Sequence, residues 1–193
     1  ESAYLGVMRR VVVDEVGGFD ESLRRGEDWE LNLRIRRAGY RVWFDPALRV
    51  TYWPRESWQR LVRQFRATGA WRGELVRRYG RRNSLRFFAP PVLVACVALA
   101  VVTGALQLTC VLSGAAALIA SIVYLPVVAY AVLVVGVALG PGGGSGWRDK
   151  LWTMGVLPSM HLAWGAGFIQ GLVRGARDTV DTSRLGSRNT PLP

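Results

Sequence analysis

A carboxylate at the start of a predicted helix is the group in this chain best suited to accept a proton. Asp28 stands near the beginning of Glu27–Ala38, whose apolar spacing, acidic start and basic end predict a helix. The helix dipole favours an anion at that end by roughly 0.3–1 kcal/mol. Leu31 and Ile35 share a helix face with Asp28, so we expect the carboxylate to point toward the domain. The alternative is an ordinary helix-capping acid.

Aromatic, amide and basic side chains occur on both sides of this carboxylate in the sequence. Before it stands Gly17-Gly18-Phe19-Asp20-Glu21, a glycine turn that ends in two acids. After it come Gln64-Phe65-Arg66 and Gly69-Ala70-Trp71-Arg72. Aromatic faces can carry sugar rings, and arginine binds phosphate oxygens. The alternatives are a plain turn for the first segment and membrane anchoring for the other two.

Three short motifs occur here in the order and spacing of a known family. They are Gly17-Gly18-Phe19-Asp20-Glu21, Gly26-Glu27-Asp28-Trp29-Glu30-Leu31 and Arg34-Ile35-Arg36-Arg37-Ala38-Gly39-Tyr40. In this succession the chain resembles the acceptor-side half of the family-2 glycosyltransferases of the GT-A fold, over residues 4 to about 86. The resemblance implies an α/β fold, with residues 1–54 forming the C-terminal part of a GT-A domain.

The resemblance implies that Asp28 is the catalytic base of an inverting sugar transfer. Such a base takes the proton of the acceptor hydroxyl as that oxygen attacks the anomeric carbon of the donor. Gln64 and Trp71 would belong to a stretched form of the QxxRW box, and its basic residue, Arg72, would meet the donor diphosphate. Glu27 could instead cap its helix, and Trp29 could be a core residue. The residues that the resemblance assigns to the acceptor are Phe19, Asp20, Glu21, Glu27, Trp29, Gln64 and Trp71.

No metal ligand is assigned within this chain. The family's DxD motif is absent, and the stretch Val50–Arg55 lacks the histidine that many relatives have there. The resemblance therefore implies a divalent cation, Mg²⁺ or Mn²⁺, with ligands mostly upstream of this chain. His161 is the only histidine, which excludes a histidine cluster.

Two short segments have the composition of strands. Arg41–Phe44 and Leu48–Tyr52 are rich in aromatic and β-branched residues and flank an Asp45-Pro46 turn. Fifty-odd residues are too few to close an α/β core by themselves, so we expect the domain to begin upstream of Glu1.

Charge is absent from a long central part of the chain. Residues 87–147 contain no Asp, Glu, Lys or Arg, and these 61 residues are about three times the ~20 that one helical span needs. Together with a second apolar run at residues 151–173, they predict a membrane region at 87–173, followed by a disordered polar tail at 174–193. The two or three spans of this all-α region are expected near 89–110, 115–139 and 151–173.

The segment before the apolar region is strongly basic. Residues 55–86 carry ten arginines against two glutamates, a net charge of +8, next to the first predicted span. Ser57–Tyr79 has an apolar stripe opposite arginines, which predicts a helix lying in the membrane interface. The alternative is a helix packed on the soluble domain. No aromatic-basic nucleic-acid motif is present, so we expect no nucleic-acid partner.

The positions of the arginines conflict with a simple topology. Three full spans would place the tail on the other side of the membrane from residues 55–86. The tail nevertheless contains four arginines, which favour the cytosolic side: Arg174, Arg177, Arg184 and Arg188. Either the positive-inside rule fails at the last helix, or residues 151–173 are re-entrant or interfacial.

These observations predict a multi-pass protein of the cell membrane whose soluble part is cytosolic. The run His161–Phe168 is similar to the last segment of succinoglycan-type exopolysaccharide glycosyltransferases. The implied partners are a nucleotide-sugar donor, a lipid-linked or polysaccharide acceptor, and membrane lipids. The alternative is a membrane-anchored scaffold or binding protein that has lost catalysis.

Overall fold

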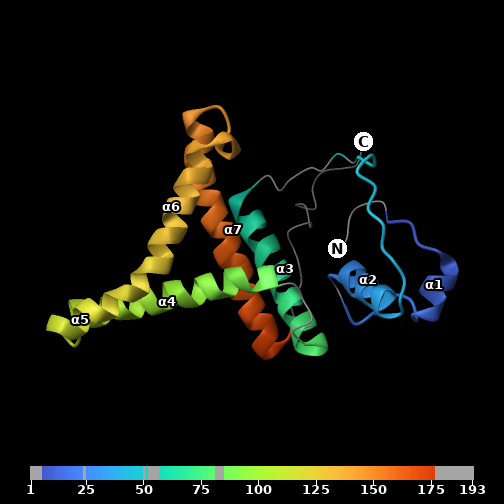
Figure 1. Cartoon of the computed structure of the whole chain (residues 1–193), viewed down its shortest axis with the longest axis horizontal. Coiled ribbons are helices and arrows are strands. Elements are labelled where there is room, and N and C mark those ends of the chain that lie inside the picture. The colour runs from blue at the N-terminus through green and yellow to red at the C-terminus, as the bar shows by residue number, and fades with distance from the viewer. Residues whose placement is uncertain (1–5, 24, 50, 52–56, 81–84, 177–193) are drawn as a thin grey trace, which may run out of the picture.

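The computed structural model describes residues 6–23, 25–49, 51, 57–80 and 85–176. Two short helices precede a long one, and a set of apolar helices follows (Figure 1). The α-helices are α1 (Arg10–Glu15), α2 (Glu27–Arg37), α3 (Trp58–Tyr79), α4 (Ala89–Leu108), α5 (Gly114–Ala120), α6 (Leu125–Leu139) and α7 (Trp147–Arg174). Three 3₁₀ turns join them: η1 (Leu85–Phe88), η2 (Ser121–Tyr124) and η3 (Pro141–Gly143).

The predicted α/β fold is wrong, because the described residues contain helices and no strand. Arg41–Phe44 forms neither helix nor strand, and its Trp43 side chain is 90% exposed. Of Leu48–Tyr52, Val50 and Tyr52 lie outside the described residues, and the others form no strand. Aromatic and β-branched composition fits a pleated, half-buried surface, but a strand also needs a neighbour to pair its N–H and C=O groups. Among the described residues neither segment has one.

The helix that carries the predicted base is confirmed. It was expected over Glu27–Ala38, and α2 spans Glu27–Arg37 with Ala38 as its C-cap. Gly39 follows with φ +91°, in the left-handed region that ends many helices. Leu31 and Ile35 are buried, as their shared face predicted.

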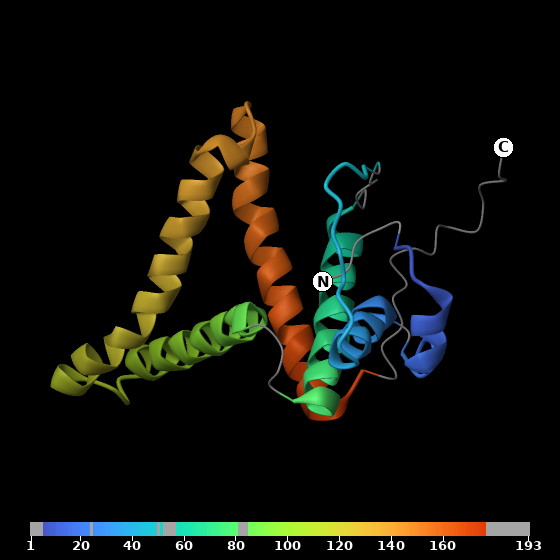
Figure 2. The same cartoon turned by 45° about the vertical axis from the view of Figure 1, so that its right-hand side comes forward.

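The basic segment forms one long helix, α3, which begins after Ser57, as predicted. The hydroxyl of Ser57 accepts a hydrogen bond from the Arg60 N–H, a usual helix-capping contact. This helix packs chiefly along α7, and the two run in the same direction (Figure 2). Whether α3 lies in a membrane interface stays a prediction.

Glycines on both helices bring the backbones of α3 and α7 into contact. A Cβ built on Gly69 or Gly73 would overlap carbonyl oxygens of α7, and one built on Gly167 or Gly171 would overlap carbonyl oxygens of α3. Each pair is spaced four residues apart, so both lie on one helix face. This spacing of small residues is the one that allows close helix packing in membranes.

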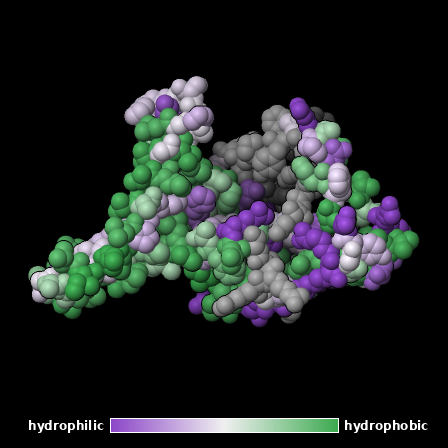
Figure 3. All heavy atoms as spheres, viewed as in Figure 1, coloured by the Kyte–Doolittle hydropathy of each residue, from purple (hydrophilic) through white to green (hydrophobic). Residues whose placement is uncertain are grey.

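Two helical segments are long and apolar enough to cross a membrane. They are Leu85–Leu108, with 24 residues, and Gly114–Leu139, with 26. Only 6% and 11% of the residues in their most apolar windows are buried, whereas a core helix of a soluble domain is mostly buried. Figure 3 shows apolar side chains gathered over α4, α5 and α6, and hydrophilic ones around α1 and α2. The third predicted span, 151–173, falls within α7 and is not among these two segments.

The α3–α7 contact leads to a stability prediction. Gly171→Ala puts a methyl group where the Ala70 carbonyl lies, so the helices must separate. We expect this substitution to lower the free energy of unfolding by about 1–3 kcal/mol, the usual cost of overpacking. Thermal unfolding of the purified protein in detergent measures the effect.

Gly136→Ala is the matched control, because a Cβ at Gly136 in α6 meets no atom within 4 Å. Its melting temperature should be unchanged or higher, since alanine favours helix over glycine. Equal destabilisation by the two substitutions would contradict the proposed role of the α3–α7 contact.

Candidate functional site

The start of α2, with the predicted base, packs against α3. Gly26 is the N-cap residue and has φ +79°, which only glycine adopts without strain. A Cβ there would lie 3.1 Å from the Trp29 ring and 3.5 Å from Leu75 of α3. The Asp28 Oδ1 atom accepts the Trp29 N–H at 2.8 Å, and the residue is half-buried. Asp28 therefore stands in the first turn of α2, close to the α3 interface.

A buried arginine joins this helix start to the first apolar segment. Arg72 is 3% exposed. Its guanidinium carbon lies 4.7 Å from the centroid of the Trp29 ring and 3.6 Å from that of Phe87 in η1. Stacking of a guanidinium on aromatic faces is worth up to about 2 kcal/mol when water is excluded. The predicted acceptor residue Trp29 and the predicted diphosphate residue Arg72 are thus brought together.

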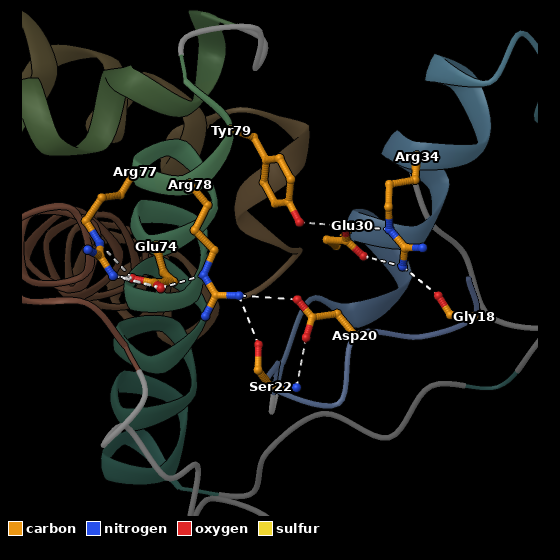
Figure 4. Close-up of polar contacts among 9 residues, drawn as sticks. All are labelled: Gly18, Asp20, Ser22, Glu30, Arg34, Glu74, Arg77, Arg78 and Tyr79. Carbon is orange, nitrogen blue, oxygen red and sulfur yellow. Dashed lines mark hydrogen bonds and ion pairs between the residues drawn. The ribbon is translucent and has the colours of Figure 1, made fainter. Parts of the chain in front are cut away.

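An ion pair within α2 holds the glycine turn. Both Glu30 oxygens accept hydrogen bonds from the Arg34 guanidinium at 2.7 Å, and the Tyr79 hydroxyl of α3 donates to Glu30 Oε1 at 2.8 Å. Arg34 also donates to the backbone carbonyls of Val16 and Gly18, at the start of the turn. Burial, followed by the bond to Glu30, raises the pKa of Tyr79 to about 12. Glu30 thereby connects α2, α3 and the turn (Figure 4).

A second ion pair connects α3 with the predicted acceptor loop. The fully buried Glu74 carboxylate accepts hydrogen bonds from Arg77 and Arg78 at 2.7–2.9 Å. Arg78 in turn donates to Asp20 Oδ2 at 3.2 Å and to the Ser22 hydroxyl at 3.0 Å. Figure 4 shows that the Arg78 side chain reaches from α3 across to the loop. Asp20 is therefore engaged in a contact that positions the loop.

The hydrogen bonds lower the pKa values of both acids in this network. For Asp20 the main cause is the bond from Ser22, and Arg78 adds to it. For Glu74 burial raises the pKa, but the hydrogen bonds and charges of Arg78 and Arg77 together outweigh burial and lower it.

The remaining predicted residues lie in different surroundings. Phe19, Glu21 and Glu27 are exposed at the edge of the site. Gln64 is half-buried in α3, and its backbone carbonyl oxygen accepts hydrogen bonds from the Arg25 guanidinium and the Thr68 hydroxyl.

Trp71, by contrast, is 1% exposed. Its indole packs in the core formed by Leu23, Ala70, Leu75 and Ala176. These are the contacts of a core residue, and a sugar contact for Trp71 stays a prediction.

A cavity of about 300 Å³ opens beside the Arg72 stack. Phe87, which covers Arg72, also stacks on Trp164 of α7, with 6.3 Å between the ring centroids. Aromatic walls with an arginine at the edge suit a ligand that is partly apolar and partly anionic. The cavity lies where α3, η1, α4 and α7 meet, and its lining residues are Phe65, Arg86, Phe87, Pro90, His161 and Trp164.

Sequence reasoning missed the residues that hold the site together. Glu74 and Arg78 had no predicted role, and Glu30 and Arg34 were named only as parts of motifs. A signal was present, because each acid is followed by arginine three or four residues later, the spacing of helical ion pairs. That spacing predicts a surface pair, however, and cannot show that another element will bury the carboxylate.

The described residues contain no group of three or more His, Cys, Asp or Glu side chains that could hold a metal ion. They offer no fit for the expected Mg²⁺ or Mn²⁺, so that cation stays a prediction.

One curated protein is similar to nearly the whole chain. It is the succinoglycan biosynthesis protein ExoA of Rhizobium meliloti (strain 1021), which is 30% identical over 175 residues. The match covers 90% of this chain and 48% of that protein, so the chain spans about half the length of this relative. The likeness to succinoglycan-type proteins is thereby confirmed. No family model matches the chain, and no solved structure matches it.

The lowered pKa values predict a loss of stability in acid. A carboxylate whose pKa is lowered by folding stabilises the folded state above its unfolded pKa, and the contribution is lost as the pH falls through the folded value. The melting temperature should therefore be steady from pH 7 to 5 and fall below about pH 4. Thermal unfolding of the protein in detergent across this pH range measures the melting temperature.

Glu74→Gln tests the origin of this acid dependence. The substitution should lower the free energy of unfolding at pH 7 by about 1–3 kcal/mol, because the buried charge-assisted bonds are lost. The substitution should also reduce the drop in melting temperature in acid. Asp14→Asn, which changes an exposed ion pair on α1, is the control. If Glu74→Gln and wild type lose stability in acid to the same extent, Glu74 is not a source of the acid dependence.

Proposed function

We propose that this chain is part of a membrane-bound inverting glycosyltransferase of exopolysaccharide synthesis. The enzyme would transfer a sugar from a nucleotide-diphosphate donor to a lipid-linked or polysaccharide acceptor at the cytosolic face of the cell membrane. The observation that carries the proposal is the match to a succinoglycan biosynthesis protein over 90% of the chain. The two ion pairs hold the glycine turn and the start of α2, which carry the first two motifs, against α3, and this supports the proposal.

Asp28 is the proposed base. Its Oδ1 atom is held by the Trp29 N–H, and among the described residues its other oxygen takes no hydrogen bond. That oxygen would accept the proton of the acceptor hydroxyl while the hydroxyl oxygen attacks the anomeric carbon and the nucleotide diphosphate leaves. The positive end of the α2 dipole favours the carboxylate before the proton arrives.

The loop that carries Phe19 and Glu21 is proposed to guide the acceptor. Its position depends on Asp20, which Arg78 ties to α3, and on Arg34, which binds carbonyls of the glycine turn. In this proposal Asp20 positions the loop, while the exposed Phe19 and Glu21 side chains meet the acceptor.

The cavity next to Arg72 supports a lipid-linked acceptor. Its walls are largely aromatic, it adjoins the start of a segment able to cross a membrane, and Arg86 supplies positive charge at its edge. An apolar chain attached to a phosphate has this combination of properties.

Replacement of Asp28 by Asn tests the proposed role directly. Asn keeps the shape and the hydrogen bond to the Trp29 N–H but cannot take up a proton at neutral pH. In the natural full-length protein we expect sugar transfer to fall on the order of 10²- to 10⁴-fold. Native membranes incubated with radiolabelled UDP-glucose, UDP-galactose and GDP-mannose, and then separated into lipid and polysaccharide fractions, measure the transfer.

Asp14→Asn controls for loss of a carboxylate, because Asp14 lies on exposed α1 and pairs only with Arg10 there. Undiminished transfer by Asp28→Asn would remove Asp28 as the base. If wild-type membranes transfer none of the three sugars above a deletion background, the alternative of a membrane-anchored scaffold is favoured.

A further inference from the structure

The ends of the two membrane-spanning candidates attach to widely separated points on α7. The start of α4 lies near the C-terminal end of α7: the Pro90 carbonyl would overlap a Cβ on Gly165, and the Phe88 ring lies 5.4 Å from the Phe168 ring. The end of α6 instead leads through a short glycine-rich turn into the first residue of α7, Trp147. Figures 1 and 2 show α7 running between these two attachment points.

This arrangement limits how α7 can lie in a bilayer. A pair of consecutive spans begins and ends on the same side of the membrane, so Pro90 and Trp147 belong at the same surface. The two attachment points on α7, at residues 147 and 165, are 18 residues apart, which is about 27 Å along a helix. That length is close to the ~30 Å of the hydrocarbon core. An α7 that crossed the bilayer would put the two ends at opposite surfaces, whereas an α7 lying along one surface keeps them together.

The charges of α3 lead to the same conclusion. Because α3 runs parallel to α7, with Trp58 beside Gly155 and the Arg66 carbonyl beside Gly167, the stretch from 58 to 66 lies along the middle of α7. Arg60, Arg63 and Arg66 all lie in that stretch. A spanning α7 would carry these arginines to the centre of the bilayer, where charged side chains are most costly.

The distribution of basic residues agrees as well. The connection between α4 and α5 contains no charged residue. After the second candidate span there are six basic residues: Arg148, Lys150, Arg174, Arg177, Arg184 and Arg188. With two spans, all six lie on the same side as the ten arginines of residues 55–86, as the positive-inside rule requires.

The exposed side chains of the α3–α7 pair are typical of a membrane surface. Trp58 of α3 packs against Trp152 of α7, with 5.5 Å between the ring centroids, and both are partly exposed. Trp147 and Leu151 at the start of α7, and Val173 at its end, are also exposed. Tryptophan is enriched at the headgroup level, and an apolar strip beside arginines favours the interface.

We infer that α3 and α7 lie together along the cytosolic surface of the bilayer, that only Leu85–Leu108 and Gly114–Leu139 cross it, and that the C-terminal tail is therefore cytosolic. The partner of the α3–α7 surface is the headgroup region of the lipid bilayer. This inference does not rest on the proposed enzymatic activity, and either can fail without the other.

Cysteine accessibility in intact bacterial cells tests the topology on the full chain. In the first variant, Cys96→Ala leaves Cys110, at the end of α4, as the only cysteine. In the second, Cys96→Ala and Cys110→Ala are combined with Ser187→Cys in the tail. A membrane-impermeant maleimide should label the Cys110 variant in intact cells, because both topologies place it outside. It should label the Ser187→Cys variant only after the membrane is permeabilised.

A reporter fused after Pro193 gives an independent result. A dual reporter of alkaline phosphatase and the β-galactosidase α-fragment produces a signal on either side of the membrane. With a cytosolic tail we expect the fusion to show β-galactosidase activity and no phosphatase activity. Phosphatase activity at this position, or labelling of Ser187→Cys in intact cells, would overturn the two-span topology and show that α7 crosses the bilayer.

Discussion

The backbones of α3 and α7 touch along one face, and this contact sets where the other helices can pack. At four glycines no side chain separates the two backbones, so the helices lie in van der Waals contact along one face. Dispersion forces act fully at that distance, and a single methyl group would displace carbonyl groups of the neighbouring helix. Because this face of α3 is occupied by α7, its opposite side is left for α2 and the glycine turn.

That opposite side of α3 holds the candidate site by charge. Glu74 and Glu30 are buried, and each is bonded to arginine, so neither carboxylate is left without a counter-ion. Such pairs add little net stability, because desolvation offsets the attraction, but breaking one is costly. Their effect here is to fix the orientation of α2 and the turn relative to α3. Asp28 and the Trp29–Arg72 stack acquire their positions from this arrangement.

In the topology that we infer, the same pairing decides the depth of α7 in the membrane. An isolated helix with the composition of residues 151–173 fits a membrane span, which is one of the two alternatives that the sequence left open. Bound to α3, it shares the position of Arg60, Arg63 and Arg66, and each arginine at the bilayer centre would cost roughly 2.5–3.5 kcal/mol or more. Of the two spans that remain, Gly114–Leu139 carries no charge, and Leu85–Leu108 carries only Arg86 at its start. The apolar length of α7 is used instead for packing with α3, α4 and α6.

The sequence was enough to predict α2 and α3, nearly to the residue, and the two apolar spans, because caps, helical periodicity and lack of charge act locally. It also predicted Asp28 at a helix start. It failed at Arg41–Phe44, since strand formation depends on a partner that composition cannot show. Helix packing is what buries Trp71 and bonds Glu30 and Glu74 within the site. It also brings four glycines into one contact: Gly69, Gly73, Gly167 and Gly171. Each of these features depends on which helices pack together, and contacts between residues far apart in the chain leave no local signal in the sequence.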